Sequence, residues 1–185
     1  MTDPGGMPES LHAMADRMKA AMFERRLLML SGDMGPARAG DVVASLLTLD
    51  ALGDDPIDVR VDAHSDSLDA AFSLMDTIDA LGVPVRVVCA GTLSGTLVGL
   101  LAVAEGRVIA PHGRIRLSEP RDSFGGRAVE VAARAAHEQQ RLVLFQRRLA
   151  ERTGRPLEHI EADMQVGRYL TAEEAVAYGL VDTVA

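Results

Sequence analysis

The 185-residue sequence has 19 Lys and Arg against 27 Asp and Glu, a net charge of −8, and 48% hydrophobic residues. This length suits one hydrophobic core, so we expect a single domain over residues 1–185. The acidic balance and the scattered arginines argue against nucleic-acid binding, because phosphate contacts need clustered Lys and Arg. The lone cysteine, Cys89, excludes an internal disulfide and is expected in the core, and no apolar run approaches the roughly 20 residues of a membrane span. We therefore expect a cytoplasmic protein without a membrane segment.

Short apolar runs alternate along the chain with longer segments of helical period. The expected strands, in chain order, are residues 27–31, 57–61, 83–90, 107–110 and 114–117. The expected helices are residues 10–24, 38–52, 68–81, 96–104 and 127–153. Residues 1–9 are expected to form a mobile tail, and residues 64–67, 91–95 and 122–126 are expected to be loops. The alternation predicts an α/β fold with βαβ crossovers, a mainly parallel sheet, and its chemistry where strands end and helices begin.

The last expected helix, residues 127–153, is unusually long. At 1.5 Å per residue it would extend about 40 Å, which exceeds what a core of this size can cover. Gly154 and Pro156 follow it in the order that ends a helix. We expect part of this helix to project from the body and to contact a partner.

The C-terminal third carries motifs that resemble a known family. Residues 152–163 read RTGRPLEHIEAD, and residues 168–184 read RYLTAEEAVAYGLVDTV. Both are similar to the matching stretches of ClpP, the proteolytic subunit of the ATP-dependent Clp protease, a ring-forming serine peptidase of the crotonase-like fold. The resemblance implies a spiral of βαβ units in which residues 127–153 form the projecting handle helix. It implies no cofactor, and no spacing typical of a metal site is present.

The resemblance also implies where a serine peptidase triad would lie, and those positions have changed. The nucleophile, base and acid positions of the family fall on Gly95, Ser118 and Gly167. The oxyanion loop of the family, which carries paired glycines, corresponds to residues 63–67, with Ser65 and Asp66 at the glycine positions. We therefore expect a catalytically degenerate subunit that forms a ring with itself or with an active ClpP-type paralogue.

The same resemblance makes docking of an unfoldase doubtful. Tyrosines that line the unfoldase pocket in the family correspond to Asp58 and Arg60 in this sequence. These two departures are the reason that unfoldase docking is in doubt, and the sequence does not identify which unfoldase the ring would meet.

Ser94, directly before Gly95, supports an alternative hypothesis. A divergent peptidase could use Ser94 as nucleophile, His64 or His112 as base and Asp66 to orient the base. The competing interpretation makes residues 64–67 a polar surface loop and His112 a turn residue. Fold analogy alone adds a third possibility, a protein that binds or hydrolyses an acyl compound.

Overall fold

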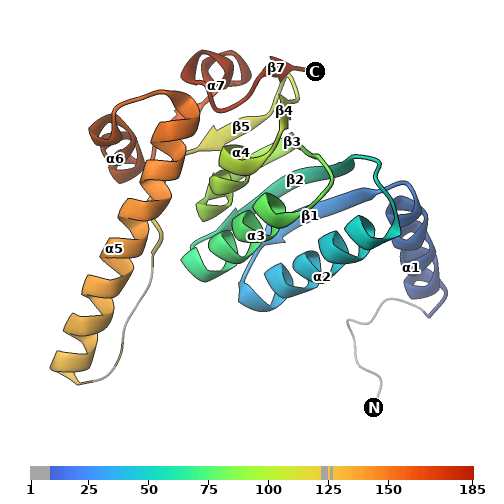
Figure 1. Ribbon diagram of the computed structural model, residues 1–185, viewed down its shortest axis with the longest axis horizontal. Coiled ribbons are helices and arrows are strands. Elements are labelled where there is room, and N and C mark those ends of the chain that lie inside the picture. Colours follow the sequence, from blue (N-terminus) through green and yellow to red (C-terminus); the bar gives the residue numbers. More distant parts are fainter. Residues whose placement is uncertain (1–8, 122–124, 126) are drawn as a thin grey trace.

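The computed structural model describes residues 9–121, 125 and 127–185 (Figure 1). The strands are β1 (Leu27–Asp33), β2 (Ile57–Ser65), β3 (Val85–Gly95), β4 (Gly106–Ile109), β5 (Arg114–Arg116), β6 (Tyr169–Leu170) and β7 (Thr183–Val184). The helices are α1 (Glu9–Glu24), α2 (Pro36–Leu52), α3 (Leu68–Ala80), α4 (Leu100–Val103), α5 (Ala128–Thr153), α6 (Leu157–Val166) and α7 (Ala172–Tyr178), with a 3-10 turn, η1 (Thr96–Gly99), before α4. Strands alternate with helices, as the sequence predicts.

The sheet is mainly parallel, which confirms the predicted α/β class. Its main path runs β1-β2-β3-β4-β7, and each neighbouring pair along this path is parallel. Strand β5 pairs with β3 beyond the end of β4, and β6 adds to β5 in the antiparallel direction. Strand β3 therefore has a partner on both sides along most of its length.

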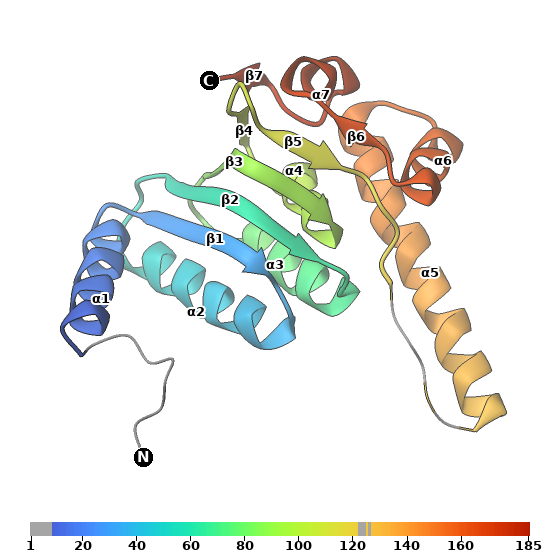
Figure 2. The same ribbon diagram turned by 180° about the vertical axis from the view of Figure 1, so that it is seen from behind.

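The two faces of the sheet differ in what covers them. Along β2, the odd-numbered residues from Ile57 to Ala63 are buried, on the side covered by α2 and α3. The even-numbered residues of β2 lie on the opposite side, which faces the viewer in Figure 2 with no helix over β1 to β3. We call this side, formed by the alternate residues of β1, β2, β3 and β5, the open face.

Helix α5 is half anchored and half projecting, as predicted from its length. Leu142, Phe145 and Leu149 are buried, and the Phe145 ring makes an edge-to-face contact with Phe72. Residues 128–140 are almost all exposed, and this part stands clear of the body in Figures 1 and 2. Gly154 ends the helix in the left-handed conformation (φ +68°), which glycine adopts without strain.

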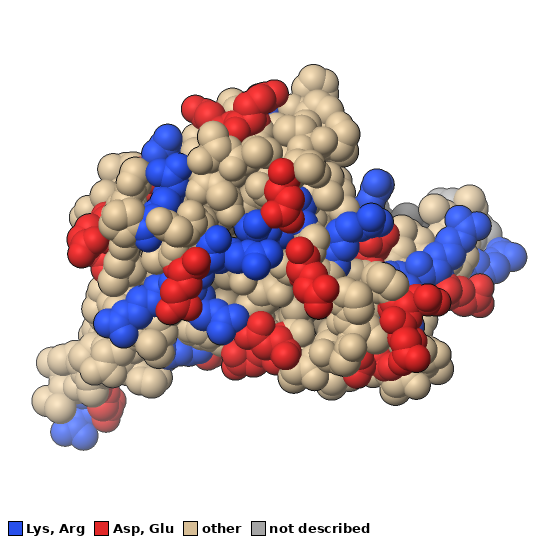
Figure 3. All heavy atoms as spheres, turned by 45° about the horizontal axis from the view of Figure 1, so that its top comes forward, with Lys and Arg blue, Asp and Glu red and all other residues tan. Residues whose placement is uncertain are grey.

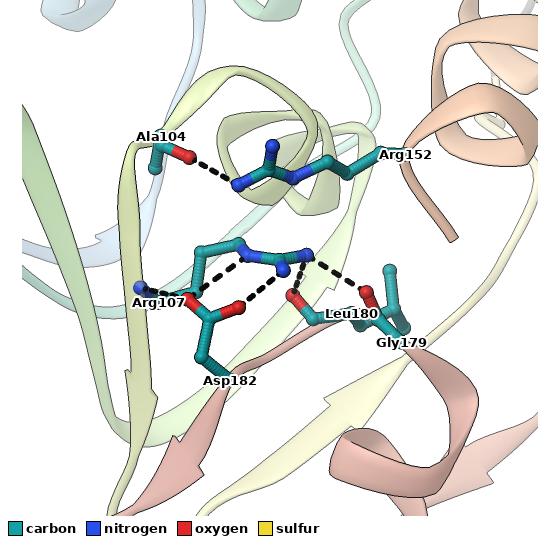
Figure 4. Close-up of polar contacts among 6 residues, drawn as sticks. All are labelled: Ala104, Arg107, Arg152, Gly179, Leu180 and Asp182. Atoms are coloured by element: carbon teal, nitrogen blue, oxygen red, sulfur yellow. Dashed lines mark hydrogen bonds and ion pairs between the residues drawn. The ribbon is translucent and has the colours of Figure 1, made fainter. Parts of the chain in front are cut away.

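A polar network ties the C-terminal segment to the body (Figure 4). The Arg107 guanidinium donates to the carbonyl oxygens of Gly179 and Leu180, and it pairs with the Asp182 carboxylate. Arg152 donates to the carbonyl oxygen of Ala104 nearby. These bonds link α5, β4 and the turn that follows α7.

Two expected loops are strands in the structure, which corrects the sequence analysis. His64 and Ser65 belong to β2, and residues 91–95 belong to β3. The expected helix 96–104 is reduced to η1 and α4. The expected tail, residues 1–9, lies outside the described residues except for Glu9, which begins α1, and of the expected loop 122–126 only Gly125 is described.

On the face shown in Figure 3, charges of both signs are interspersed, and Lys and Arg side chains lie next to Asp and Glu. Across residues 9–121, 125 and 127–185, no helix combines the length and the apolar character that crossing a bilayer requires.

Candidate functional site

A row of polar residues crosses the open face where the strands end. Each member is the direct partner of the next in the sheet register, so all lie on one face at one level. From β1 to β6 these residues are Asp33, His64, Ser94, Arg116 and Tyr169. We call this set the polar row.

Ser94 and His64 are in contact within the polar row. The Oγ atom of Ser94 lies 3.0 Å from Nδ1 of His64, and Nε2 of the same ring lies 3.2 Å from Oδ2 of Asp66. Ser94 is 7% exposed, whereas the side chains of His64 and Asp66 are 38% and 35% exposed. The structure therefore brings together the serine, histidine and carboxylate of the alternative hypothesis in hydrogen-bonding order.

Ser94 is the penultimate residue of β3, directly before the chain passes through Gly95 into η1. It is still paired in the sheet, with β2 on one side and β5 on the other. Backbone N–H groups in such a doubly paired strand belong to the sheet. An N–H group that is bonded in the sheet is not available to an oxyanion, whose stabilisation is commonly the largest single contribution to acyl transfer.

Gly95, which the resemblance assigns to the nucleophile position, has no room for a side chain. Its backbone adopts φ +66° and ψ −141°, a conformation that residues other than glycine rarely hold. A Cβ atom at this position would lie 2.0 Å from the carbonyl oxygen of Ser65 and 2.9 Å from Cε1 of His64. The pairing of Ser65 with Gly95 in the β2–β3 ladder causes this close approach.

The segment that corresponds to the oxyanion loop is fixed in place. Ser65 is 1% exposed, and its hydroxyl donates to the carbonyl oxygen of Met34 at 2.6 Å. The Ser65 carbonyl accepts a hydrogen bond from Oγ1 of Thr96, and the backbone N–H of Ser67 donates to Oγ of Ser65. Movement of this segment away from Gly95 would break several of these bonds.

The two remaining expected triad positions, Ser118 and Gly167, lie beside the β5 end of the polar row. Ser118, 7% exposed, follows β5 by two residues, and Gly167 ends α6 in the left-handed conformation (φ +72°). A Cβ atom at Gly167 would lie 3.2 Å from Nη2 of Arg116. The sequence-predicted positions therefore gather beside the polar row, with an arginine next to the expected acid position.

A cavity of about 630 Å³ opens at the same end of the sheet. Its walls are the ends of β1 and β2, the segment after β5, and one side of α5. Ser65 and Asp66 line it, whereas Ser94 and Gly95 do not. The carboxylates along its walls belong to Asp33, Asp66, Asp69, Glu119 and Glu138. The cavity is thus polar and is separated from the candidate nucleophile.

The remaining predicted residues have simpler surroundings. Asp58 holds Arg86 through two hydrogen bonds of 2.7 and 2.6 Å on the open face, and Arg60 is exposed beside it. His112 lies in an exposed turn, as one of the two interpretations expects, and only His64 contacts Ser94. Within the described residues, no group of three or more His, Cys, Asp or Glu side chains could hold a metal ion.

Arg116 is the residue that the sequence analysis missed. The strand it belongs to has only three residues, and its place beside Ser94 follows from the β3–β5 register. The sequence contains one signal, the alternation of Arg114 and Arg116 around the buried Ile115, which indicates two arginines on one face.

Comparison with known proteins gives concordant matches over nearly the whole chain. The family model described as Clp protease matches residues 9–185. The ATP-dependent Clp protease proteolytic subunits 1 of Corynebacterium glutamicum and Corynebacterium diphtheriae are each 31% identical over 169 residues, covering 89% of this chain and 81% of each relative. The ATP-dependent Clp protease proteolytic subunit of Pleurastrum terricola is 26% identical over 196 residues, covering 98% of both chains.

Proposed function

The chain belongs to the Clp protease family, and we propose that it is a catalytically degenerate, ClpP-like subunit that forms or completes a ring assembly. The whole chain would act as one domain, in the cytoplasm, and would contribute the walls of the assembly. The ring would contain this chain alone or together with an active ClpP-type paralogue. Docking of an unfoldase to this subunit is doubtful, because Asp58 and Arg60 stand on the open face at the positions of the family's pocket tyrosines.

The observation that carries the proposal is the closed space at Gly95. A serine there would need a backbone carbonyl to move, because its Cβ would lie 2.0 Å from the Ser65 oxygen. The changes at Ser118 and Gly167 remove the base and the acid at the corresponding positions. Loss of all three groups, together with an oxyanion segment fixed by Met34 and Thr96, supports an inactive family site.

Probe labelling tests the proposal directly. The purified protein is treated with a fluorophosphonate and, separately, with a fluorogenic peptide, alongside an active ClpP-type peptidase as positive control. We expect neither labelling nor cleavage by this chain, because a fluorophosphonate reacts with an activated serine. Labelling of any serine, located by peptide mass mapping, would contradict the proposal.

A divergent peptidase that uses Ser94 is the second candidate. The contact of 3.0 Å between Ser94 and His64, with Asp66 at 3.2 Å on the other ring nitrogen, favours it. Its weakness is the doubly paired strand, whose bonded N–H groups are not available to an oxyanion. Labelling that disappears in Ser94→Ala and His64→Gln, but persists in the matched variant Ser67→Ala, would establish this candidate in place of the first.

Ring formation is tested by sedimentation across a concentration series. Head-to-tail contacts close into cyclic rings, and the family symmetry leads us to expect a species near seven subunits. Pairing of two rings is expected to be weak, because Val166 and Gly167 stand where the family has a charged contact. A monomer at every concentration would contradict the ring, and a double ring that never dissociates would contradict weak pairing.

A further inference from the structure

Arg116 is a guanidinium without an anionic partner. It contacts the Tyr169 ring, with its central carbon 5.2 Å from the ring centroid. Among the residues that the structure describes, nothing forms an ion pair or hydrogen bond with it, and its Nε atom is buried without a partner. Arginine keeps its charge in proteins, and a charged donor that is removed from water without a partner is unfavourable. The arrangement is one that an anionic ligand would complete.

Several other arginines of the chain have a partner within it. Arg86, Arg107, Arg148 and Arg168 each pair with an aspartate. Arg114, two residues before Arg116 on the same face, donates to the carbonyl oxygen of Gly113. Arg26 and Arg152 also have buried guanidinium nitrogens without a partner, but each donates to a backbone carbonyl oxygen through another nitrogen, whereas Arg116 has no hydrogen bond or ion pair among the described residues.

The neighbours of Arg116 add hydrogen-bonding groups and space. Ser94 is its direct partner in the register, and the Ser94 hydroxyl is already in contact with His64. On the other side, Gly167 has no side chain, and a Cβ atom there would lie 3.2 Å from Nη2 of Arg116. An anion above Arg116 would thus meet a hydroxyl on one side and an open position on the other, with the aromatic ring of Tyr169 alongside.

We propose that Arg116, together with Ser94, His64 and Tyr169, binds a carboxylate group on the open face of the sheet. A guanidinium presents a planar fork that matches the two oxygens of a carboxylate. Asp33 lies at the β1 end of the polar row and Asp66 contacts His64, and the charge of these carboxylates disfavours a dianion such as phosphate more than a monoanion. The carboxylate belongs to a free small acid or to the C-terminus of a peptide. This proposal is independent of whether the family site is inactive.

Nuclear magnetic resonance of the arginine Nε–Hε groups tests the proposal in the 15N-labelled, assembled protein. Three ligands are titrated at constant ionic strength: sodium acetate, N-acetyl-dialanine with a free C-terminus, and the amide of the same peptide. We expect the Arg116 signal to shift saturably with both carboxylates and to remain unchanged with the amide. Binding of the peptide acid at least tenfold more tightly than acetate would identify a peptide C-terminus as the source, and equal binding would identify a free small acid.

Three variants locate the site. Arg116→Gln is expected to abolish saturable binding, measured by calorimetry. Arg114→Gln is expected to keep it, because Arg114 lies on the same strand and face but donates to the Gly113 carbonyl oxygen. Gly167→Asp is expected to weaken external carboxylate binding at least tenfold, because its own carboxylate can reach Arg116. Aspartate is among the residues that tolerate positive φ.

Several results would overturn the proposal. Absence of a saturable Arg116 shift in the wild-type protein would do so without reference to any variant. Equal shifts with the peptide acid and its amide, or equal losses in Arg116→Gln and Arg114→Gln, would show that the carboxylate is not held by Arg116. Tighter binding of inorganic phosphate than of acetate would refute the choice of a monoanion.

Discussion

Gly95→Ser restores the family's nucleophile type and is expected to destabilise the protein. The new Cβ would lie 2.0 Å from the Ser65 carbonyl oxygen, and the serine would hold φ +66°. A residue other than glycine in such a backbone region costs about 1–3 kcal/mol, and overpacking costs a further 1–3 kcal/mol or so. The sum is about 2–6 kcal/mol, a large part of a typical total stability of roughly 5–15 kcal/mol. At about 2–4 °C per kcal/mol for a chain of this size, a loss of about 4 kcal/mol lowers Tm by roughly 8–16 °C.

Urea denaturation at fixed protein concentration measures this loss, with Gly40→Ala as the matched control. Gly40 lies inside α2 with nothing within 4 Å of an added Cβ, so alanine there should stabilise by about 0.5–1 kcal/mol. A Gly95→Ser protein that melts within about 2 °C of wild type would refute the reasoning, because it would show that Ser65 moves at little cost.

The same close approach limits attempts to restore peptidase activity. The triple variant Gly95→Ser, Ser118→His and Gly167→Asp is expected to remain without strong peptidase activity on a fluorogenic peptide. Adding Ser65→Gly and Asp66→Gly frees the segment and should raise the rate tenfold or more, if each recovered oxyanion contact contributes over about 1.4 kcal/mol. Robust cleavage by the triple variant alone would show that the segment does not matter.

Two further predictions concern stability and pH. Arg107→Met should lower the free energy of unfolding by about 2–3 kcal/mol, because it removes the side-chain donors to the carbonyl oxygens of Gly179 and Leu180 and to Asp182, which keeps only the backbone N–H of residue 107. Arg86→Met, at an exposed pair, should cost under about 1 kcal/mol, and similar losses would contradict the distinction. Burial raises the pKa of Asp182, but hydrogen bonds from the Arg107 side chain and backbone, together with the Arg107 charge, outweigh burial, so the pKa lies below its usual value of 3.8. The stabilisation is therefore fully present above that value and is lost as pH falls through the folded-state pKa. Asp182→Asn should abolish this part of the acid sensitivity of urea unfolding. Burial raises the pKa of Cys89 to about 12, so Ellman's reagent at pH 8 should react with it only in the unfolded protein, and fast reaction of the folded protein would contradict its place in the core.

The long helix was predictable because local signals determine it. The expected range 127–153 differs from α5 by one residue, since helix-forming residues run without interruption until Gly154 and Pro156. The strand ends at the candidate site were not predictable in this way. His64, Ser65 and residues 91–95 are polar or glycine-rich and indicate a loop, but pairing between β2 and β3 draws them into the sheet.

Contacts within the site depend on register, which a single sequence does not reveal. The possible partnership of Ser94, His64 and Asp66 could be proposed from residue types alone. Whether the residues meet depends on the irregularity between Val61 and Ala63, where β3 gains extra residues and Asp62 accepts the N–H of Thr92. The register between β3 and β5 places Arg116 opposite Ser94, which residue types alone could not indicate.

Amide hydrogen exchange along the projecting half of α5 should depend on whether another subunit packs against it. Residues 128–140 have few tertiary contacts, and an isolated helix of that length is marginal in water. Their amide hydrogens should exchange with solvent through local fraying, while those near Phe145 and Leu149 exchange only through larger openings. Any assembly that packs against this segment would slow its exchange, so protection along one helix would distinguish a free subunit from an assembled one.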